Sequence, residues 1–371
     1  MVEQIKKQLD LENILTKAHR FQPLSRAEIK YLLTIDEEEQ VQLLFTAARD
    51  TRNKYFGNKV FLYGFVYFST WCRNDCTFCF YGASNSHSNR YRKNDQEILD
   101  AAYRLAESGV QLIDLTMGED PFFFQNTEEF LKLARLIEKI KKHTGLPVMI
   151  SPGAAPNEVI KAFKEAGADW YACYQETHTP ELFNKLRLKQ SYDFRLSKKH
   201  YAKEIGLLIE EGILTGIGDT VDDVINSLEK MRELKAQQVR VMSFTPQKGS
   251  RMENWESPSR RRELLSIAVM RLLFPNKLIP ASLDVDGITG LQERIMAGAN
   301  VVTSIIPPNT GLAGVSRSLL DINEGFRTVE GVIPLLEILG LIPATVDEYS
   351  FWLNNEKNLL VTGVNLVSKI V

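Results

Sequence analysis

Residues 59–79 read KVFLYGFVYFSTWCRNDCTFC, an apolar run of strand length followed directly by three cysteines. The cysteines have the spacing Cys72-Arg-Asn-Asp-Cys76-Thr-Phe-Cys79, and the fourth cysteine of the chain is the distant Cys173. A secreted disulfide scaffold uses more cysteines and spaces them apart, so this grouping instead indicates a metal or redox centre. Because the group follows the apolar run at once, we expect the centre at the carboxyl end of the first strand.

That run is the first of eight short apolar segments that alternate with amphipathic, helix-like stretches. The predicted strands are 60–68, 110–116, 147–151, 169–175, 212–216, 238–243, 278–284 and 300–305. The predicted helices between them are 95–108, 127–143, 157–166, 197–211, 221–234, 260–273 and 290–297, several of which should end at a glycine (Gly109, Gly145, Gly167, Gly212). Eight βα units predict an α/β fold, a closed (βα)8 TIM-type barrel whose active site lies at the carboxyl ends of the strands.

The barrel is expected to span 58–346 and to be flanked by two different segments. Residues 1–57 have apolar residues at helical spacing among many charges, which predicts an N-terminal helical extension. Residues 347–371 form a C-terminal tail for which the sequence suggests no place. An open, doubly wound sheet is the alternative to the barrel, but no GxGxxG motif follows the first strand.

The charge balance argues against polymer and membrane partners. The 45 Lys+Arg and 47 Asp+Glu residues leave a formal charge of −2 over 371 residues, so no basic surplus exists to hold a nucleic-acid backbone. The N-terminus has no apolar signal core, and the apolar stretch 332–346 is interrupted by proline, glycine and glutamate. We therefore expect a cytoplasmic protein that binds neither nucleic acid nor membranes. We also expect a monomer that acts on a small molecule.

The cysteine spacing leaves two kinds of centre open. Three thiolates on one loop can hold an iron–sulfur cluster and leave one iron free for a substrate or cofactor. Alternatively, Cys72, Cys76 and Cys79 could form a structural zinc site with His87 or His178, although such sites commonly use CxxC pairs. Cys173 lies in an apolar run and is expected to be a buried core residue rather than a cluster ligand.

The CxxxCxxC motif after a first barrel strand, with aromatic Phe78 before the third cysteine, resembles the radical S-adenosylmethionine (SAM) superfamily. Further segments, in the same order over about residues 40–345, resemble the methylornithine synthase family of pyrrolysine biosynthesis. They are YFSTWCRNDCTFCFY (67–81), IDLTMGEDP (113–121), YQET (174–177), GILTGIG (212–218), VRVMSFTPQ (239–247) and LIPASLD (278–284). The biotin synthase and hydrogenase-maturase branch is the wider relative.

This resemblance implies an enzyme in which Cys72, Cys76 and Cys79 hold a [4Fe–4S] cluster whose open iron binds SAM. An electron donor such as ferredoxin or flavodoxin would reduce the cluster, and a 5′-deoxyadenosyl radical would then abstract hydrogen from the substrate, so no side chain is assigned as catalytic. The implied reaction is an isomerisation of L-lysine to 3-methyl-D-ornithine by fragmentation and recombination. Two alternatives stay open: a maturase-like radical SAM enzyme for another small amino acid, and a non-enzymatic barrel with zinc.

The resemblance also implies a set of cofactor-binding residues. They are Phe78, Glu119, Glu176, Arg195 and Gly216, which would contact SAM between the cluster and the strand ends. Three of them have a plainer interpretation: Glu119 because acidic residues favour helix starts, Arg195 because isolated arginines are mostly on the surface, and Gly216 because glycine after a strand is common in turns.

Four polar residues inside predicted strands are candidates for substrate binding. Asp114, Arg240, Ser282 and Asp284 lie in otherwise apolar runs, where an unpaired charge is costly. A diamino acid such as lysine needs a guanidinium for its carboxylate and acidic partners for its two ammonium groups. The alternative is an internal Arg–Asp ion pair that only stabilises the barrel.

Overall fold

The apolar run before the cysteines forms β1 in a computed structural model that describes residues 10–307 and 326–362. Eight parallel strands follow the hydrogen-bonded order β8-β7-β5-β4-β3-β1-β10-β9. They are β1 (Lys59–Ser69), β3 (Leu112–Met117), β4 (Val148–Ser151), β5 (Trp170–Ala172), β7 (Leu208–Thr215), β8 (Gln238–Ser243), β9 (Pro280–Ser282) and β10 (Val301–Ile305). Just ahead of β9, Leu278 bridges to Gln238 of β8, so the sheet is nearly closed. The predicted TIM-type barrel is confirmed.

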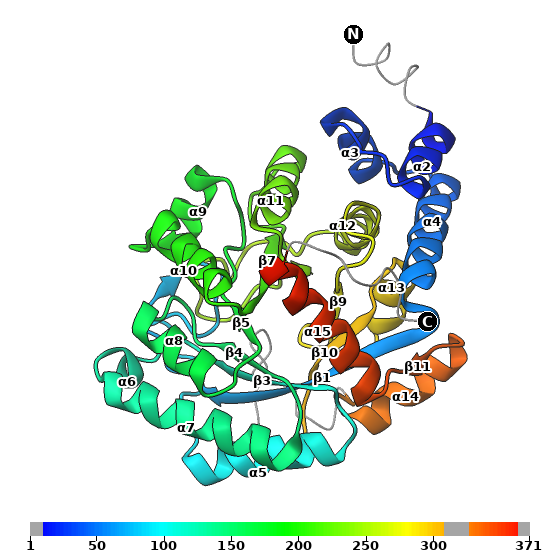
Figure 1. Ribbon diagram of the computed structural model, residues 1–371. Coiled ribbons are helices and arrows are strands. Elements are labelled where there is room, and N and C mark those ends of the chain that lie inside the picture. The colour runs from blue at the N-terminus through cyan, green and yellow to red at the C-terminus, as the bar shows by residue number, and fades with distance from the viewer. Residues whose placement is uncertain (1–9, 308–325, 363–371) are drawn as a thin grey trace.

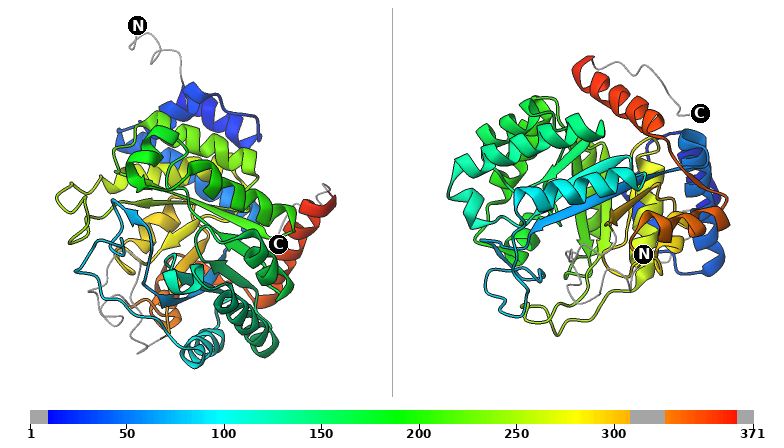
Figure 2. Two further views of the ribbon diagram at one scale, coloured as in Figure 1. Left: turned by 90° about the vertical axis from the view of Figure 1, so that its left-hand side faces the viewer. Right: turned by 90° about the horizontal axis from the view of Figure 1, so that it is seen from below.

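Helices surround this barrel (Figures 1 and 2). The N-terminal part contributes α2 (Leu11–His19), α3 (Arg26–Leu33) and α4 (Glu38–Phe56). The barrel units contribute α5 (Asp95–Glu107), α6 (Pro121–Phe124), α7 (Thr127–Thr144), α8 (Asn157–Glu165), α9 (Pro180–Leu186), α10 (Tyr192–Glu204), α11 (Val221–Leu234), α12 (Arg260–Leu273), α13 (Leu291–Met296) and α14 (Val329–Ile338). α4 packs against α12, so the N-terminal helices extend the outer layer. In the described ranges, no helix is long and apolar enough to cross a bilayer.

Three short strands lie outside the ring of eight barrel strands. β2 (Asp75–Cys76) pairs antiparallel with β6 (Arg187–Leu188), and β11 (Ile342–Pro343) pairs with the start of β1. The first of these pairs ties the cysteine loop to the segment between α9 and α10. The loop is therefore held from two sides rather than projecting freely.

One predicted boundary was wrong. The stretch 197–211 was assigned to a helix that ends at Gly212, but α10 ends at Glu204 and β7 begins at Leu208. Glu210 and Glu211 resemble a solvated helix face in the sequence, yet both are fully buried in the strand with charged partners. Gly212 lies within β7, where a Cβ atom would come 2.9 Å from the ring of Tyr174.

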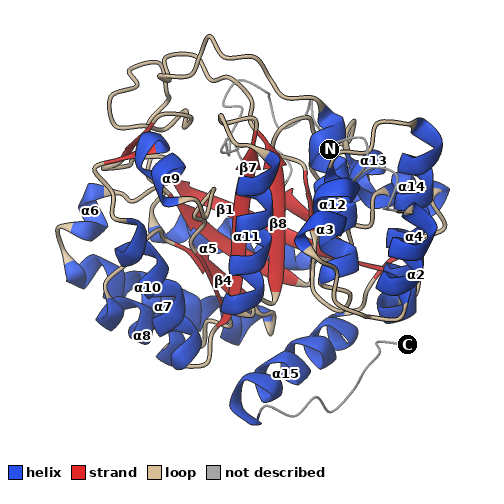
Figure 3. Ribbon diagram, turned by 90° about the horizontal axis from the view of Figure 1, so that it is seen from above, coloured by secondary structure: helices blue, strands red, loops and turns tan. Residues whose placement is uncertain are grey.

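The C-terminal tail, for which the sequence suggested no position, contains most of α15 (Val346–Thr362). This helix covers the amino-terminal end of the barrel. The Tyr349 hydroxyl lies 2.8 Å from the hydroxyl of Tyr63, and the Trp352 indole stacks on Trp170 with centroids 5.9 Å apart. Figure 3 shows α15 at the end of the barrel opposite the long loops. The helix therefore forms a floor, and the open end is the one with the cysteines. Residues 1–9 and 363–371, which belong to the predicted extension and tail, lie outside the described residues.

Candidate active site

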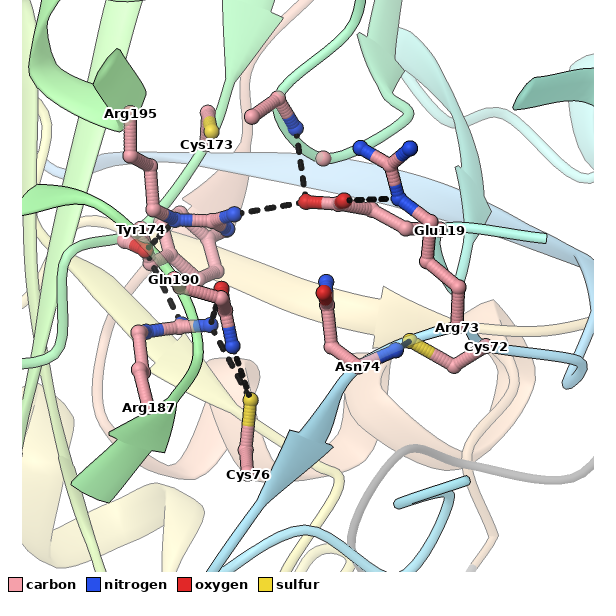
Figure 4. Close-up of polar contacts among 12 residues, drawn as sticks. Cys72, Arg73, Asn74, Cys76, Glu119, Cys173, Tyr174, Arg187, Gln190 and Arg195 are labelled. Atoms are coloured by element: carbon pink, nitrogen blue, oxygen red, sulfur yellow. Dashed lines mark hydrogen bonds and ion pairs between the residues drawn. The ribbon is translucent and has the colours of Figure 1, made fainter. Parts of the chain in front are cut away.

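The three clustered cysteines lie on the loop after β1, at the carboxyl end of the barrel. Gln190 Nε2 donates to Cys76 Sγ at 3.1 Å, and Arg187 Nη1 donates to the same sulfur at 3.4 Å (Figure 4). The backbone N–H of Asn74 donates to Cys72 Sγ at 3.5 Å. Hydrogen bonds of this kind stabilise sulfur that carries negative charge, as in a metal-bound thiolate.

The arrangement fits a cluster better than a single metal ion. Within the described ranges, no three His, Cys, Asp or Glu side chains converge as the ligands of one ion would. His178, a proposed zinc ligand, is buried elsewhere, with Nδ1 3.0 Å from the Tyr192 hydroxyl and Nε2 3.3 Å from Glu211 Oε2. A cubane spaces its thiolates because each binds a different iron. Burial, together with the nearby Cys76, raises the pKa of the Cys72 thiol to about 11, so a cationic centre is needed to form the thiolate.

A cavity of about 1170 Å³, open to solvent, separates the cysteines from the strand ends. All three clustered cysteines line it, as do four of the five predicted cofactor residues, Phe78, Glu119, Glu176 and Arg195. Gly216 lies outside this lining: its φ is +85°, and a Cβ atom there would come 2.4 Å from the Pro258 ring, which already accounts for a glycine. Cys173 is 2% exposed and belongs to the apolar core, yet it also lines the cavity.

Glu119 and Arg195 form an ion pair on the cavity wall. Arg195 Nη1 donates to Glu119 Oε1 at 2.8 Å, and its Nε donates to the Tyr174 carbonyl at 2.8 Å. Arg73 Nε donates to the other Glu119 oxygen at 3.0 Å. Burial alone would raise the pKa of Glu119, but Arg195 and its other donors hold it below the usual value. Glu119 is therefore ionised and fixes the guanidinium of Arg195 beside the cavity.

Glu176 is held in an unusual backbone conformation. Its φ is +67°, a left-handed value that costs a non-glycine residue of order 1–3 kcal/mol. Its Oε1 accepts from Arg187 Nη2 at 2.9 Å. Burial raises the pKa of Glu176 even though Arg187 opposes the rise. Strain of this kind persists only where the surroundings impose it.

The backbone of Glu176 is bonded to β7 through Gly212 and Leu214, and a buried ionic group behind the wall holds the residue before it, Gln175. Lys199 Nζ contacts Glu211 and donates to the Cys173 carbonyl at 3.0 Å and to Gln175 Oε1 at 2.9 Å. Glu211 Oε1 accepts the backbone N–H of Gln175 at 2.8 Å. Burial disfavours the Glu211 carboxylate, but Lys199 and His178 hold its pKa at about 2. This group was not predicted, because Lys199 and Glu211 both lie in the stretch 197–211 that was assigned to a helix.

Below the cavity, Arg240, Asp114 and their neighbours form a buried polar region inside the barrel, here called the chamber; Arg240 and Asp114 do not line the cavity. Arg240 Nε donates to Glu210 Oε1 at 2.7 Å, its Nη1 donates to Thr303 at 3.1 Å, and the Tyr174 hydroxyl donates to Glu210 Oε2 at 2.8 Å. Two buried atoms, Arg240 Nη2 and Asp114 Oδ2, have no hydrogen-bond partner among the described residues. Burial, and beyond it the charge of Glu210, raises the pKa of Asp114 to about 7. Among the described residues, Arg240 thus keeps one unpaired donor atom and Asp114 one unpaired acceptor atom inside the barrel.

Asp284 lies in a second, more fully occupied network. The Tyr67 hydroxyl contacts its oxygens at 2.8 and 2.9 Å, Ser304 Oγ donates to it at 2.8 Å, and Arg327 Nη2 donates to it at 2.7 Å. Ser282 Oγ lies 3.2 Å from Ser304 Oγ and accepts the Asp284 N–H. Arg327 was not predicted, because no local pattern distinguishes it from a surface arginine. All four predicted substrate residues are buried in the barrel.

Comparisons with known proteins agree with this geometry. The radical SAM superfamily profile matches residues 66–231. Over 326 residues the chain is 44% identical to the 3-methylornithine synthase of Methanosarcina acetivorans, a match that covers 88% of this chain and 92% of that protein. It is 31% identical over 292 residues to the hydrogenase maturase subunit HydE of Thermotoga maritima, covering 78% and 82%. The crystal structure of methylornithine synthase (PylB) superposes with a TM-score of 0.87 at 41% identity, covering 91% of this chain and 99% of that one.

Barrel, cysteine loop and similarity together define a radical SAM enzyme, and the chain belongs to the radical SAM superfamily. Within the superfamily, it is similar to the 3-methylornithine synthases and, at lower identity, to the hydrogenase maturases. The resemblance drawn from the cysteine spacing is confirmed, and the non-enzymatic zinc barrel is set aside.

Proposed function

We propose that Cys72, Cys76 and Cys79 hold a [4Fe–4S] cluster and that SAM occupies the cavity they line. When bound, this pair supplies a carbon-centred radical that removes hydrogen from a substrate. The protein's part is to position the cofactor and exclude water. The observation that supports the assignment is a single cavity that joins the three cysteines to Phe78, Glu176 and the Glu119–Arg195 pair.

The charges on the cavity wall suit the zwitterionic end of SAM. Arg195 is the donor for its carboxylate, because Glu119 and the Tyr174 carbonyl fix the guanidinium plane. Glu176, held by Arg187, is the acceptor for a group on the opposite side of the ligand. Glu119 already accepts three hydrogen bonds, so we assign it to the positioning of Arg195. The ammonium group of SAM would then be bound by backbone groups nearby.

Replacing Arg195 by alanine should weaken SAM binding by about 10–100-fold, the equivalent of one charge-assisted hydrogen bond of roughly 1.5–3 kcal/mol. Glu176→Gln should weaken it less, since the amide still accepts a hydrogen bond. The measurement is the Kd for SAM on cluster-loaded protein. Phe194→Ala, on the exposed face of the same helix, is the matched control and should leave the Kd unchanged. If both variants bind SAM like the parent protein, the cofactor lies elsewhere.

We further propose that the substrate is L-lysine and the product 3-methyl-D-ornithine, an intermediate of pyrrolysine biosynthesis. The names of the relatives and the unpartnered atoms of the chamber support this. Arg240 Nη2 is the donor for the α-carboxylate, and Asp114 Oδ2 is the acceptor for the α-ammonium. Asp284 and Ser282 line the region for the side-chain ammonium, where Arg327 shares the charge of Asp284. Anchoring both ends would keep reactive fragments close enough to recombine.

Lysine binding should depend on pH through Asp114. With a pKa of about 7 in the free chamber, Asp114 is neutral below that pH and attracts an ammonium group only weakly. The KM for lysine should therefore rise as the pH falls from 8 to 6, by up to about tenfold per unit below the pKa, because both lysine ammonium groups stay charged there. Asp114→Asn should raise the KM and flatten its pH profile. A flat profile for the parent protein would exclude a titrating Asp114 from the site.

Product analysis tests the proposed function. Cluster-loaded protein is incubated without oxygen with lysine, SAM and dithionite, and the amino acids are then separated by mass and chromatography. A methyl-branched isomer of lysine supports the proposal. The similarity to HydE favours a second candidate, a related radical reaction on another small amino acid. Cleavage of SAM with lysine left unchanged would favour that candidate.

A further inference from the structure

Arg187 lies directly opposite Cys76 in the short antiparallel ladder of β2 and β6, where the two residues are register partners. The backbone N–H of Thr77 donates to the carbonyl of Leu186 at 2.9 Å, so the ladder is held on both sides of this pair. The position of the Arg187 side chain relative to the cysteine loop is therefore fixed by backbone pairing and does not depend on side-chain packing alone.

The guanidinium of Arg187 spans the boundary between the cysteine loop and the cavity wall. Its Nη1 donates to Cys76 Sγ at 3.4 Å, and its Nη2 donates to Glu176 Oε1 at 2.9 Å and to the Tyr174 carbonyl at 3.0 Å. It also lies over the ring of Phe78, 5.5 Å from the centroid. One cation thus contacts a cluster ligand and two of the predicted cofactor residues at once.

Little water surrounds this charge. The Arg187 side chain is 7% exposed and that of Glu176 is 13% exposed, so charges here interact more strongly than they would at the surface. Gln190 Nε2 donates to the same Cys76 sulfur at 3.1 Å but carries no charge (Figure 4). A cationic and a neutral donor on one sulfur allow the effect of the charge to be separated from that of the hydrogen bond.

Hydrogen bonds and charges beside the sulfurs help to set the reduction potential of an iron–sulfur cluster. Reduction adds one negative charge to the cluster, so a cation at a ligand sulfur stabilises the reduced form more than the oxidised form. Glu176 opposes this effect, because its carboxylate neutralises part of the Arg187 charge and is itself negative. The two side chains should therefore shift the potential in opposite directions.

We propose that Arg187 is a positioning residue that raises the reduction potential of the cluster through Cys76, and that Glu176 limits this rise. The inference rests on the proposed cluster. The electron that reduces the cluster comes from an external one-electron donor, which is oxidised in the same step. Arg187 thereby makes the cluster easier to reduce, while its second contact holds Glu176 at the cavity wall.

The test is a redox titration of cluster-loaded protein without SAM. Dithionite is the reductant, mediators set the potential, and the reduced cluster is quantified by electron paramagnetic resonance. Arg187→Gln removes the charge and keeps a donor, whereas Glu176→Gln removes the opposing charge. Arg251→Gln is the matched control, because Arg251 pairs with Asp75 beside Cys76 but its side chain is 58% exposed.

Arg187→Gln should lower the potential by about 59 mV, which corresponds to a tenfold change in a one-electron equilibrium. Glu176→Gln should raise it by a similar amount. Gln190→Met should lower it less than Arg187→Gln, since only a neutral donor is lost. Arg251→Gln should keep the parent value, because solvent screens an exposed charge. Iron content should match the parent protein in all four variants.

An unchanged potential in Arg187→Gln at full iron content would overturn the proposal. A fall or no change in Glu176→Gln would also overturn it, and this variant decides alone if Arg187→Gln retains no cluster. Simple loosening of the cysteine loop would lower the iron content of both variants rather than shift their potentials in opposite directions. Absence of a reduced-cluster signal in the parent protein would instead refute the proposed cluster itself.

Discussion

Cys76→Ala should abolish both iron incorporation and SAM cleavage. Cys76 is one of three thiolates on the loop after β1, and its sulfur accepts hydrogen bonds from Arg187 and Gln190. With two thiolates left, a [4Fe–4S] cluster loses one of its three protein ligands and is not retained. The measurement is iron and acid-labile sulfide per chain after anaerobic reconstitution, followed by the yield of 5′-deoxyadenosine.

Cys173→Ala is the matched control, because the same substitution is made at a cysteine that lines the same cavity from the opposite wall. It should keep the full iron content and bind SAM. A complete cluster in Cys76→Ala would remove the basis of the cofactor assignment. Loss of the cluster in Cys173→Ala would place that residue among the ligands.

Arg240→Lys should reduce kcat/KM for lysine by about 10²–10⁴-fold while the cluster and the Kd for SAM are retained. Lysine keeps the charge beside Glu210 but cannot reproduce the fork that contacts Glu210, Thr303 and the substrate together. Two lost charge-assisted contacts of roughly 1.5–3 kcal/mol each give this range. Steady-state kinetics with lysine provide the measurement.

Arg271→Lys controls for the loss of a buried arginine. Arg271 is fully buried and bonded to backbone carbonyls and Asn300, on α12 outside the chamber. Its replacement should lower the free energy of unfolding but leave kcat/KM of the folded protein unchanged. Normal turnover by Arg240→Lys, or equal reaction of a monoamine analogue, would refute binding of lysine at both ends.

The barrel and the cysteine loop were predictable because their signals are local. Strands of a parallel barrel are short apolar runs, and three thiol ligands on one loop have a recognisable spacing. The positions of Asp114, Arg240 and Asp284 inside such runs also indicated a polar interior correctly, since the structure buries all three. Their partners could not be inferred in the same way.

The site residues that the sequence analysis did not predict were missed for one physical reason. Glu210, Glu211 and Lys199 are charged residues whose burial is stabilised only by contacts between distant segments, so the local pattern resembles a solvated helix. Arg327 contacts Asp284 across 43 residues of sequence, a pairing that no local motif encodes. Likewise, the role of α15 depends on aromatic contacts with Tyr63 and Trp170 on distant strands.

A mixed-isotope experiment tests whether the enzyme isomerises lysine and keeps the fragments of one molecule together. The enzyme is given equal amounts of unlabelled lysine and lysine carrying ¹³C at every carbon, and the isomer formed is analysed by mass spectrometry. We expect a 3-methylornithine that is either fully labelled or fully unlabelled, because Arg240 and Asp114 would anchor the substrate inside the barrel above α15 and keep the fragments of one molecule together. Partly labelled product would contradict retention of the fragments, and the absence of any lysine isomer would contradict the proposed function itself.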